Sequence, residues 1–315
     1  MNYSKQFITA LKQNDLQTLR SIPKTDFHNH FVLGGSRSYI KQKTGYDIRP
    51  IKEPINSMDE MHQWNSQNIG EHFDSKDMRK LLIEATFVQA KEDGISILEI
   101  GEDVWGLSEF FSNNIEELIS AFTETNRLIA PEIELRLQIG LSRHCDIDYL
   151  LGCLEPFWGR KEFYSIDLYG DELAQPIENF VPIYRKAKEN GLRLKAHIGE
   201  WGTADDIIKG VELLGLDEVQ HGIAAASSKE TMEYLRKHHI TLNITPTSNL
   251  LLGRVSSMKE HPIAKLYHEG VDVTINSDDI LMFDSAVSKE YLALYQNEVL
   301  TVEELNEIRI KSLQK

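Results

Sequence analysis

The feature that most constrains the fold of this chain is a repeated alternation between short strand-like runs and amphipathic helical patterns. The expected strands are Thr25–Phe31, Ser96–Gly101, Glu134–Leu141, Phe163–Tyr169, Arg193–Ile198, Glu218–His221, Ile240–Thr245 and Asp272–Asn276. Helical patterns between them include Asp77–Glu92, Glu178–Glu189, Thr203–Leu214 and Lys229–His238. Strands that alternate with helices pair in parallel, and eight of them close a barrel. The sequence therefore predicts an α/β fold of the (β/α)₈ TIM-barrel type.

A doubly wound open sheet is the alternative fold. It would normally carry a glycine-rich phosphate-binding turn after its first strand, and Gly34-Gly35 is a weak match to that turn. No Pro-, Gly- or Ser-rich linker divides the chain, so we expect one domain over residues 1–315. The segment from about residue 39 to 74 shows no clear hydrophobic pattern but favours helix. We expect it to form a small helical cap after the first strand.

Charge and composition narrow the class of partner. With 34 basic and 49 acidic residues, the net charge of −15 disfavours a nucleic-acid surface, which needs clustered Lys and Arg. No apolar run reaches the roughly 18 residues of a membrane span, and the first 20 residues read as an amphipathic helix rather than a signal peptide. The two cysteines, Cys145 and Cys153, fit small buried apolar side chains in a reducing compartment. We expect a cytoplasmic protein that binds a small molecule.

Chemically distinctive side chains lie where the expected strands end, which is where barrel enzymes place their active sites. His28 and His30 are two residues apart, so on a strand both imidazoles point to one face. His197 lies near the end of the fifth strand, and Asp278 follows the eighth. Imidazole nitrogen and carboxylate oxygen are zinc ligands, so the sequence predicts a site for one zinc ion, although other divalent metals suit the same donors.

Three further polar residues lie close to this expected metal site. Glu200 is three residues beyond His197, close enough to transfer protons without binding the metal. His221 ends the sixth strand, and Asp279 follows Asp278. Taken alone, Glu200 and Asp279 would be ordinary carboxylates near helix starts. A bound zinc ion lowers the pKa of water from about 15.7 to about 7, so the expected site can supply a nucleophile at neutral pH.

Several ordered motifs resemble those of the adenosine deaminase family, within the amidohydrolase superfamily. They are KTDFHNH (Lys24–His30), FYSIDLYGDE (Phe163–Glu172), HIGE (His197–Glu200), QHG (Gln220–Gly222), TPTSN (Thr245–Asn249) and TINSDD (Thr274–Asp279). The resemblance runs from about residue 22 to 291 and is strongest over residues 163–283. It implies hydrolytic removal of an exocyclic amino group, with release of ammonia.

The resemblance also implies a role for each matching residue. The zinc ligands would be His28, His30, His197 and Asp278. Glu200 would protonate the ring nitrogen beside the attacked carbon, His221 would orient the attacking hydroxide, and Asp278 would contact both metal and nucleophile. Asp279 and the backbone of Gly170 would bind the purine from opposite sides, and His30 would also face the substrate. The cysteine-based PCxxC zinc motif of cytidine deaminases is absent from the sequence.

The sequence departs from the family directly after His30. The family has an acidic residue there that contacts the ribose, whereas this chain continues with Phe31, Val32 and Leu33. A site that lacks this acceptor loses a contact that can discriminate by about 10⁴-fold. Adenosine-like amino-purines therefore include a nucleoside, a free base and a modified relative as candidate substrates. Arg37 and Lys41 are candidate contacts for a phosphate, or else solvated surface charges.

Lys195 is a second departure, because it lies two residues before His197 and should point into the barrel. We expect it either to pair with Asp26 or to lean towards solvent, since an unpaired buried charge is costly. A carbamylated lysine that bridges two metals would come from the fourth strand, and Phe163–Gly170 contains no lysine. One metal is therefore expected.

The sequence predicts a zinc-dependent deaminase of an adenosine-like amino-purine. A mononuclear metal hydrolase that cleaves an amide, ester or ring bond is the alternative, but it has no evident need for Asp279. A non-catalytic binding protein on the same barrel is a third possibility, and the complete set of ligands and proton carriers argues against it.

Overall fold

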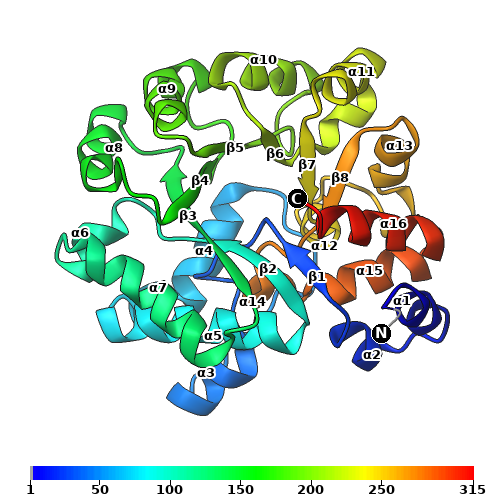
Figure 1. Ribbon diagram of the computed structural model, residues 1–315, viewed down its shortest axis with the longest axis horizontal. Coiled ribbons are helices and arrows are strands. Elements are labelled where there is room, and N and C mark those ends of the chain that lie inside the picture. Colours follow the sequence, from blue (N-terminus) through cyan, green and yellow to red (C-terminus); the bar gives the residue numbers. More distant parts are fainter. Residues whose placement is uncertain (1–2) are drawn as a thin grey trace.

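The computed structural model describes residues 3–315, and its centre is one sheet of eight parallel strands in sequential order. The strands are β1 (Lys24–Asp26), β2 (Ile95–Ile100), β3 (Glu134–Ser142), β4 (Phe163–Tyr169), β5 (Arg193–Ile198), β6 (Glu218–His221), β7 (Thr241–Ile244) and β8 (Asp272–Ile275). A parallel bridge between Asn29 and Asp278 joins the chain beyond β1 to the chain beyond β8. The predicted barrel is confirmed, with its strands at the centre and helices around them (Figure 1).

Helices follow most strands, as the alternating pattern predicts. The α-helices are α1 (Tyr3–Lys12), α2 (Leu16–Arg20), α3 (Arg37–Thr44), α4 (Met58–Asn68), α5 (Lys76–Glu92), α6 (Gly106–Phe111), α7 (Ile115–Ile129), α8 (Ile147–Leu154), α9 (Val181–Glu189), α10 (Ala204–Leu214), α11 (Lys229–His238), α12 (Pro246–Leu251), α13 (Ile263–His268), α14 (Ile280–Phe283), α15 (Val287–Gln296) and α16 (Val302–Ser312). Shorter 3₁₀ turns are η1 (Gly70–Phe73), η2 (Glu155–Phe157), η3 (Ile177–Phe180), η4 (Ile223–Ser227) and η5 (Met258–Glu260).

Local sequence signals explain where helix α10 begins and ends. Thr203 and Asp206 form a reciprocal capping box that satisfies backbone N–H groups of the first turn. Gly215 ends the helix with a left-handed φ of 69°, a conformation that glycine adopts without strain. The helix places the residues that follow β5 at the C-terminal mouth of the barrel.

Strand β1 is shorter than the sequence predicts, because it ends at Asp26 and not at Phe31. Beyond Asp26 the backbone turns from β2 towards the chain that follows β8. The N–H of Phe27 donates to Oδ1 of Asn276 at 2.8 Å, and the N–H of Asp278 donates to the carbonyl of His28 at 2.8 Å. These contacts replace the strand ladder and bring the first histidine pair next to the eighth strand end.

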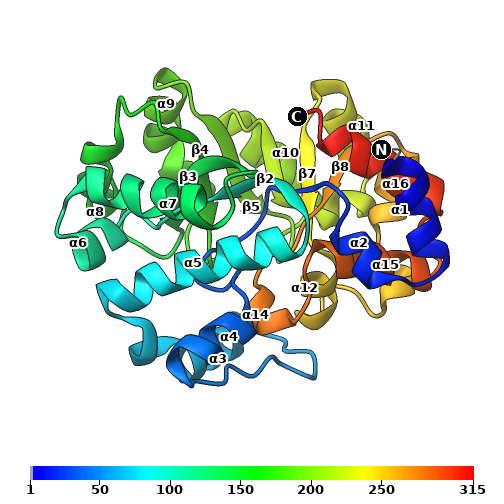
Figure 2. The ribbon, with the colours of Figure 1, turned by 60° about the horizontal axis from the view of Figure 1, so that its bottom comes forward.

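Helices α3, α4, α12 and α14 lie on one side of the barrel (Figure 2). The segment before α4 is attached to this mouth by backbone hydrogen bonds from Ile51 to Met282 (3.0 Å) and from Ile55 to Leu251 (2.8 Å). A small apolar cluster joins the same parts of the chain, with Leu252, Met282 and Phe283 at its centre and Met61, Trp64 and Trp201 around them. The cluster fixes α4 beside the loops that carry the predicted site residues.

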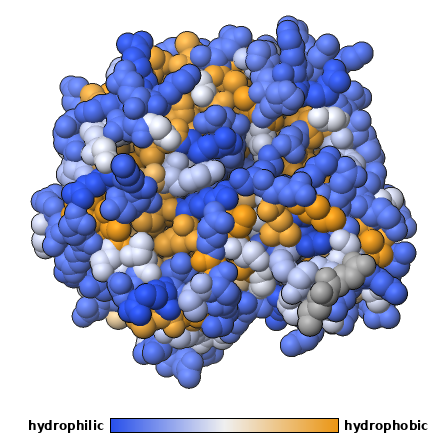
Figure 3. All heavy atoms as spheres, in the orientation of Figure 1, coloured by the Kyte–Doolittle hydropathy of each residue, from blue (hydrophilic) through white to orange (hydrophobic). Residues whose placement is uncertain are grey.

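The outside of the molecule is mostly polar, with apolar patches between charged side chains (Figure 3). Across residues 3–315, no helix is long and apolar enough to cross a membrane. Cys145 and Cys153 are free and only partly buried, so the expectation that both are buried is wrong. They contact the apolar core from its edge.

Candidate active site

Four predicted metal ligands meet at the mouth of the barrel. The ring centroids of His28 and His30 are 5.4 Å apart, and that of His197 lies 4.7 Å from His28. The Nε2 atoms of His28 and His30 lie 3.5 Å and 3.4 Å from Oδ1 of Asp278. The chain ends of β1, β5 and β8 thus gather three imidazoles and one carboxylate in a single cluster. Candidate ligand atoms of His28, His30 and Asp278 lie within 4.8 Å of one another.

Neighbouring groups orient two of these imidazoles. Nδ1 of His28 lies 3.0 Å from the carbonyl oxygen of Asn243, and Nδ1 of His197 lies 3.4 Å from Oδ1 of Asp167. Nε2 of both rings is buried without a hydrogen-bond partner among the described residues. Burial lowers the pKa of His28 and of His30 to about 3. Burial also acts to lower the pKa of His197, but the charge of Asp167 outweighs it and raises that pKa. His28, a neutral ring with one nitrogen oriented and the other unpartnered, is suited to metal binding.

Two residues of the candidate site, Asp278 and His221, have a left-handed backbone conformation. Asp278 has a φ of 65° and His221 a φ of 60°, which is uncommon for residues other than glycine. Such conformations cost about 1–3 kcal/mol each and persist where surrounding contacts enforce them. Here they aim two functional side chains into the barrel mouth.

Glu200 lies beside the metal-ligand cluster, as the sequence predicts. Its Oε1 accepts a hydrogen bond from Nδ2 of Asn249 at 2.9 Å and lies 3.4 Å from Nδ1 of His221. The same His221 nitrogen lies 2.9 Å from Oγ1 of Thr245. Burial raises the pKa of Glu200 to about 8, and the charge of Asp278 adds to the effect. A carboxyl group in this environment holds a proton near neutral pH.

The two predicted purine contacts line the same cavity. Oδ1 of Asp279 is buried without a hydrogen-bond partner among the described residues. Burial raises the pKa of Asp279 well above its usual value, and the negative charges of Asp278 and Glu200 raise it further. Gly170 follows β4 with a φ of 88°, a conformation that accounts for glycine at this position.

Glu172 fixes the loop that carries Glu200, a role that its position at the end of the second motif did not reveal. Its carboxylate accepts the N–H groups of Gly199 (2.6 Å), Glu200 (3.1 Å), Trp201 (2.8 Å) and Gly202 (3.1 Å). Hydrogen bonds from successive backbone amides to a buried carboxylate are strong and restrict the backbone. Glu172 is therefore a positioning residue for Glu200.

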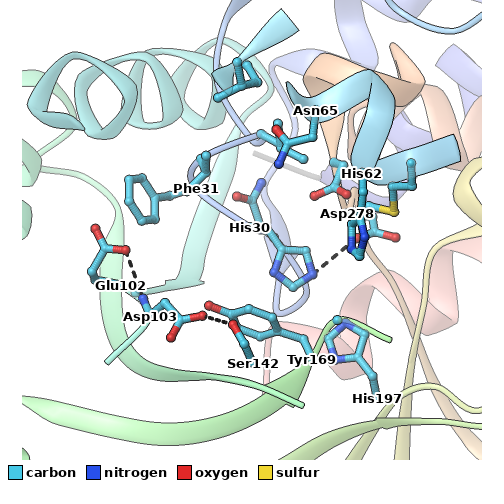
Figure 4. Close-up of a pocket in the computed structure, with 18 of the residues that line it drawn as sticks. His30, Phe31, His62, Asn65, Glu102, Asp103, Ser142, Tyr169, His197 and Asp278 are labelled. Carbon is cyan, nitrogen blue, oxygen red and sulfur yellow. Dashed lines mark hydrogen bonds and ion pairs between the residues drawn. The ribbon is translucent and has the colours of Figure 1, made fainter. Parts of the chain in front are cut away.

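A cavity of about 610 Å³ connects the cluster, Glu200 and Asp279. Helix α4 contributes Met58, Met61 and Asn65 to its wall. Val32 and Leu33 also line it, so the position of the missing acidic residue faces the cavity as an apolar surface. In Figure 4, His30 lies at the centre, with Asp278 on one side and Tyr169 on the other.

Arg37 and Lys41 lie outside this cavity. Arg37 pairs with Asp284 at 2.6 Å and also donates to the carbonyl of Leu281, while Lys41 pairs with Asp47 at 3.2 Å. Both therefore fit the surface interpretation rather than the phosphate-binding one. His144 is exposed and also lines the cavity.

The expectation for Lys195 is wrong. Lys195 is buried, and its Nζ lies 2.8 Å from Oε1 of Glu99 and 3.1 Å from Oε2 of Glu218. Burial alone would lower the pKa of Lys195, but the two carboxylates outweigh it and raise the pKa. Asp26 instead accepts hydrogen bonds from Ser277 and Asn29. The two-residue spacing from His197 predicts correctly that Lys195 points into the barrel, but its partners come from β2 and β6, which the spacing does not reveal.

We expect Lys195→Met to lower the free energy of unfolding by about 3–5 kcal/mol, because it leaves the buried Glu99 carboxylate without its cation, while Glu218 keeps Arg193 at 2.8 Å. Chemical denaturation measures the change. A double variant that also carries Glu99→Met should recover much of the loss, since it removes the carboxylate that is left without a cation. A loss below about 1 kcal/mol in the single variant would contradict the assigned pairing.

Comparison with known proteins agrees with the fold and with the ordered motifs. The family model described as adenosine deaminase matches residues 111–315. A Treponema pallidum protein that bears the name adenosine/adenine deaminase is 30% identical over 279 residues, which span 87% of this chain and 92% of the relative. These matches place the chain among the hydrolytic deaminases. The chain belongs to the adenosine deaminase family.

Solved structures show the same fold at low sequence identity. An amidohydrolase from Burkholderia ambifaria with bound Zn superposes with a TM-score of 0.81 at 19% identity, covering 98% of this chain and 88% of that chain. Adenine deaminase from Arthrobacter aurescens gives a TM-score of 0.76 at 20% identity, covering 92% and 93% of the two chains.

Proposed function

We propose that this protein is a zinc-dependent enzyme that hydrolytically deaminates an adenosine-like amino-purine and releases ammonia. The observation that carries the proposal is the position of the buried Glu200 carboxyl group. It lies in one cavity with a histidine and aspartate cluster and with the unpartnered carboxyl of Asp279. Family membership and relatives that bear the names adenosine deaminase and adenine deaminase support the same chemistry.

The residues proposed to hold the zinc ion are His28, His30, His197 and Asp278. Their donor set fits, because two buried Nε2 atoms lack hydrogen-bond partners among the described residues and a carboxylate oxygen lies beside them. When bound, the ion supplies Lewis-acid activation of water at neutral pH. The zinc-containing amidohydrolase with the same fold makes zinc the preferred ion.

Proton transfer is assigned to Glu200 and His221. An aromatic amine is a poor electrophile, so the ring nitrogen next to the attacked carbon must gain a proton as water adds. Glu200 holds a proton near neutral pH. Asn249 donates a hydrogen bond to its side chain, and the Glu172 carboxylate accepts a hydrogen bond from its backbone N–H. His221 lies beside it, and burial keeps the pKa of His221 well below its usual value. A neutral imidazole there can accept the proton that the attacking water loses.

Orientation of the purine is assigned to Asp279, Gly170 and His30. The unpartnered Oδ1 of Asp279 offers a hydrogen-bonding group to one edge of the base. Gly170 has no side chain between its backbone and the cavity, so the opposite edge can approach closely. His30 reaches the cavity as well as Asp278, so it can contact both metal and substrate.

We infer that residues 1–315 act as one domain in which the segment around 39–74 caps the substrate. Met58, Met61 and Asn65 of α4 line the cavity, and the apolar cluster around Met282 attaches this segment to the barrel. A cytoplasmic location is part of the proposal, supported by the two free cysteines. Its partner is the small substrate, with no nucleic-acid or membrane partner proposed.

The function is tested by incubating the zinc-loaded protein with amino-purine bases, nucleosides and nucleotides and measuring ammonia with a coupled assay. The expected result is ammonia release from at least one compound, with the amine replaced by oxygen in the product. Cleavage of an amide, ester or ring bond without ammonia would assign the hydrolase alternative instead.

We expect kcat to fall as the pH rises through the pKa of Glu200, because the proton donor is then lost. Burial raises the pKa of Glu200 to about 8, and a cation bound nearby would lower it, so the falling limb should lie at or below about pH 8. A kcat profile from about pH 5 to about pH 10 at saturating substrate measures this limb. An increase in kcat that continues through about pH 9 would contradict the assignment.

A further inference from the structure

A second polar cluster lies across the cavity from Asp279. It consists of Asp103, which follows β2, Ser142 at the end of β3 and Tyr169 at the end of β4, and all three line the cavity. Figure 4 shows the Tyr169 ring close to His30, with Asp103 and Ser142 on its far side from His197. The ring centroids of Tyr169 and His30 are 4.9 Å apart. The cluster therefore lies one side chain away from the proposed metal site.

Backbone contacts hold this cluster rigidly. Asp103 forms a parallel bridge with Gly140, and the N–H of Val104 donates to the carbonyl of Gly140 at 3.0 Å. A Cβ at Gly140 would lie 2.3 Å from the Tyr169 hydroxyl, so glycine is needed for Tyr169 to occupy this place. The hydroxyl of Ser142 donates to Oδ2 of Asp103. One carboxylate oxygen is thus fixed by the protein.

The other oxygen, Oδ1 of Asp103, has no hydrogen-bond partner among the described residues. The residue is only 4% exposed, so bulk water reaches it poorly. Burial raises the pKa of Asp103 to about 7, although the hydrogen bond from Ser142 acts to lower it. Leaving a buried carboxylate oxygen unpaired is costly, and a ligand that donates a hydrogen bond to it would remove that cost.

The rest of the cavity restricts what this ligand can be. Val32 and Leu33 offer no side-chain acceptor for a substrate hydroxyl at the position of the missing acid. Among the described lining residues, the one arginine or lysine is Arg79, which forms a two-point ion pair with Glu102. The charges of Arg79 and Glu102 cancel. The described lining residues therefore include no arginine or lysine that is free to bind a phosphate group. Glu102 on this side is occupied by Arg79, so Asp103 is the buried carboxylate here that has an unpartnered oxygen.

We propose that Asp103 determines substrate specificity by accepting a hydrogen bond from an N–H or O–H group at the end of the amino-purine remote from Asp279. The proposal rests on the proposed deaminase function, because it concerns the same cavity. The donor can be the ring N–H of a free base or a hydroxyl of an attached sugar. In either case β2 supplies the acidic contact that the chain lacks after His30.

Binding is measured by isothermal titration calorimetry of the zinc-loaded protein in a Glu200→Gln background, in which turnover is slow compared with binding. The ligands are adenine, 9-methyladenine, adenosine and 2′,3′-dideoxyadenosine. Asp103→Leu should raise the dissociation constant of the ligand that carries the donor by roughly 100-fold, since a hydrogen bond to a buried charged acceptor is lost. The isosteric Asp103→Asn variant keeps an acceptor oxygen and should lose roughly tenfold or less. Melting temperature and zinc content serve as folding controls.

If Asp103→Leu weakens the binding of adenine and leaves the affinity for 9-methyladenine unchanged, the proposal is supported and the ring N–H is the donor. If it weakens the binding of adenosine and leaves the affinity for 2′,3′-dideoxyadenosine unchanged, the proposal is supported and a sugar hydroxyl is the donor. Equal weakening of every ligand, no weakening, or no binding of any ligand to the parent would overturn it. Because the binding measurement does not depend on turnover, an absence of ammonia release would refute the deaminase function separately from this proposal.

Discussion

Glu200→Gln should lower the rate of ammonia release by about 10²- to 10⁴-fold, the range that general acid–base catalysis contributes. Gln has nearly the same shape and can still interact with Asn249 and His221, but it has no carboxyl proton to give to the ring nitrogen. The deaminated product would therefore form slowly even when substrate is bound. Steady-state kinetics, with ammonia measured by a coupled assay, gives kcat and KM for both proteins.

Zinc content and KM are the controls for this variant. Glu200 is not a proposed ligand, so bound zinc per chain should match the parent, and KM should change much less than kcat. A control substitution at an exposed carboxylate on the following helix, Asp205→Asn, should leave both constants unchanged. A Glu200→Gln protein that retains most of its kcat would remove Glu200 from the mechanism.

Asp278→Asn and Asp279→Asn should separate metal binding from substrate binding. Asp278 lies within 3.5 Å of both His28 and His30 and is a proposed ligand. Its replacement should deplete the zinc and lower kcat by more than about 100-fold, because the ion contributes several kcal/mol of transition-state stabilisation. Asp279 has no partner for Oδ1 among the described residues, so its replacement should lower kcat/KM by roughly 10- to 150-fold and leave the zinc in place.

Elemental analysis after dialysis against a chelator measures zinc in both variants. The two aspartates are adjacent in sequence and equally buried, so a general effect on folding would change both proteins alike. Equal loss of zinc in the two variants, or zinc loss in Asp279→Asn alone, would contradict the assigned roles.

Much of this architecture follows from local patterns in the sequence. Strand β5 and helix α11 match their predicted bounds, because a continuous buried run defines the strand and the N-cap Ser228 with a basic last turn defines the helix. The cluster of His28, His30, His197 and Asp278 follows from the rule that barrel strands end at the active site. That rule holds although His28 and His30 lie beyond the end of β1, because the bridge from Asn29 to Asp278 holds this segment beside the chain that follows β8.

Side-chain contacts between strands could not be predicted from local sequence patterns. Lys195 pairs with Glu99 on β2 and Glu218 on β6, and this pairing depends on how the strands are staggered around the barrel. The anchor formed by Glu172 depends on a loop conformation that exposes four amides in succession. Asp103 could have been found by its place after β2, but its unpartnered oxygen is a property of three-dimensional packing.

The central claim, replacement of an amino group by an oxygen atom from water, is tested most directly by running the reaction in water enriched in oxygen-18. Mass spectrometry of the product and a parallel ammonia assay complete the measurement. The account predicts one oxygen-18 atom in each product molecule and one ammonia released with it. A product that gains oxygen-18 without release of ammonia, or no conversion of any amino-purine by the zinc-loaded protein, would contradict it.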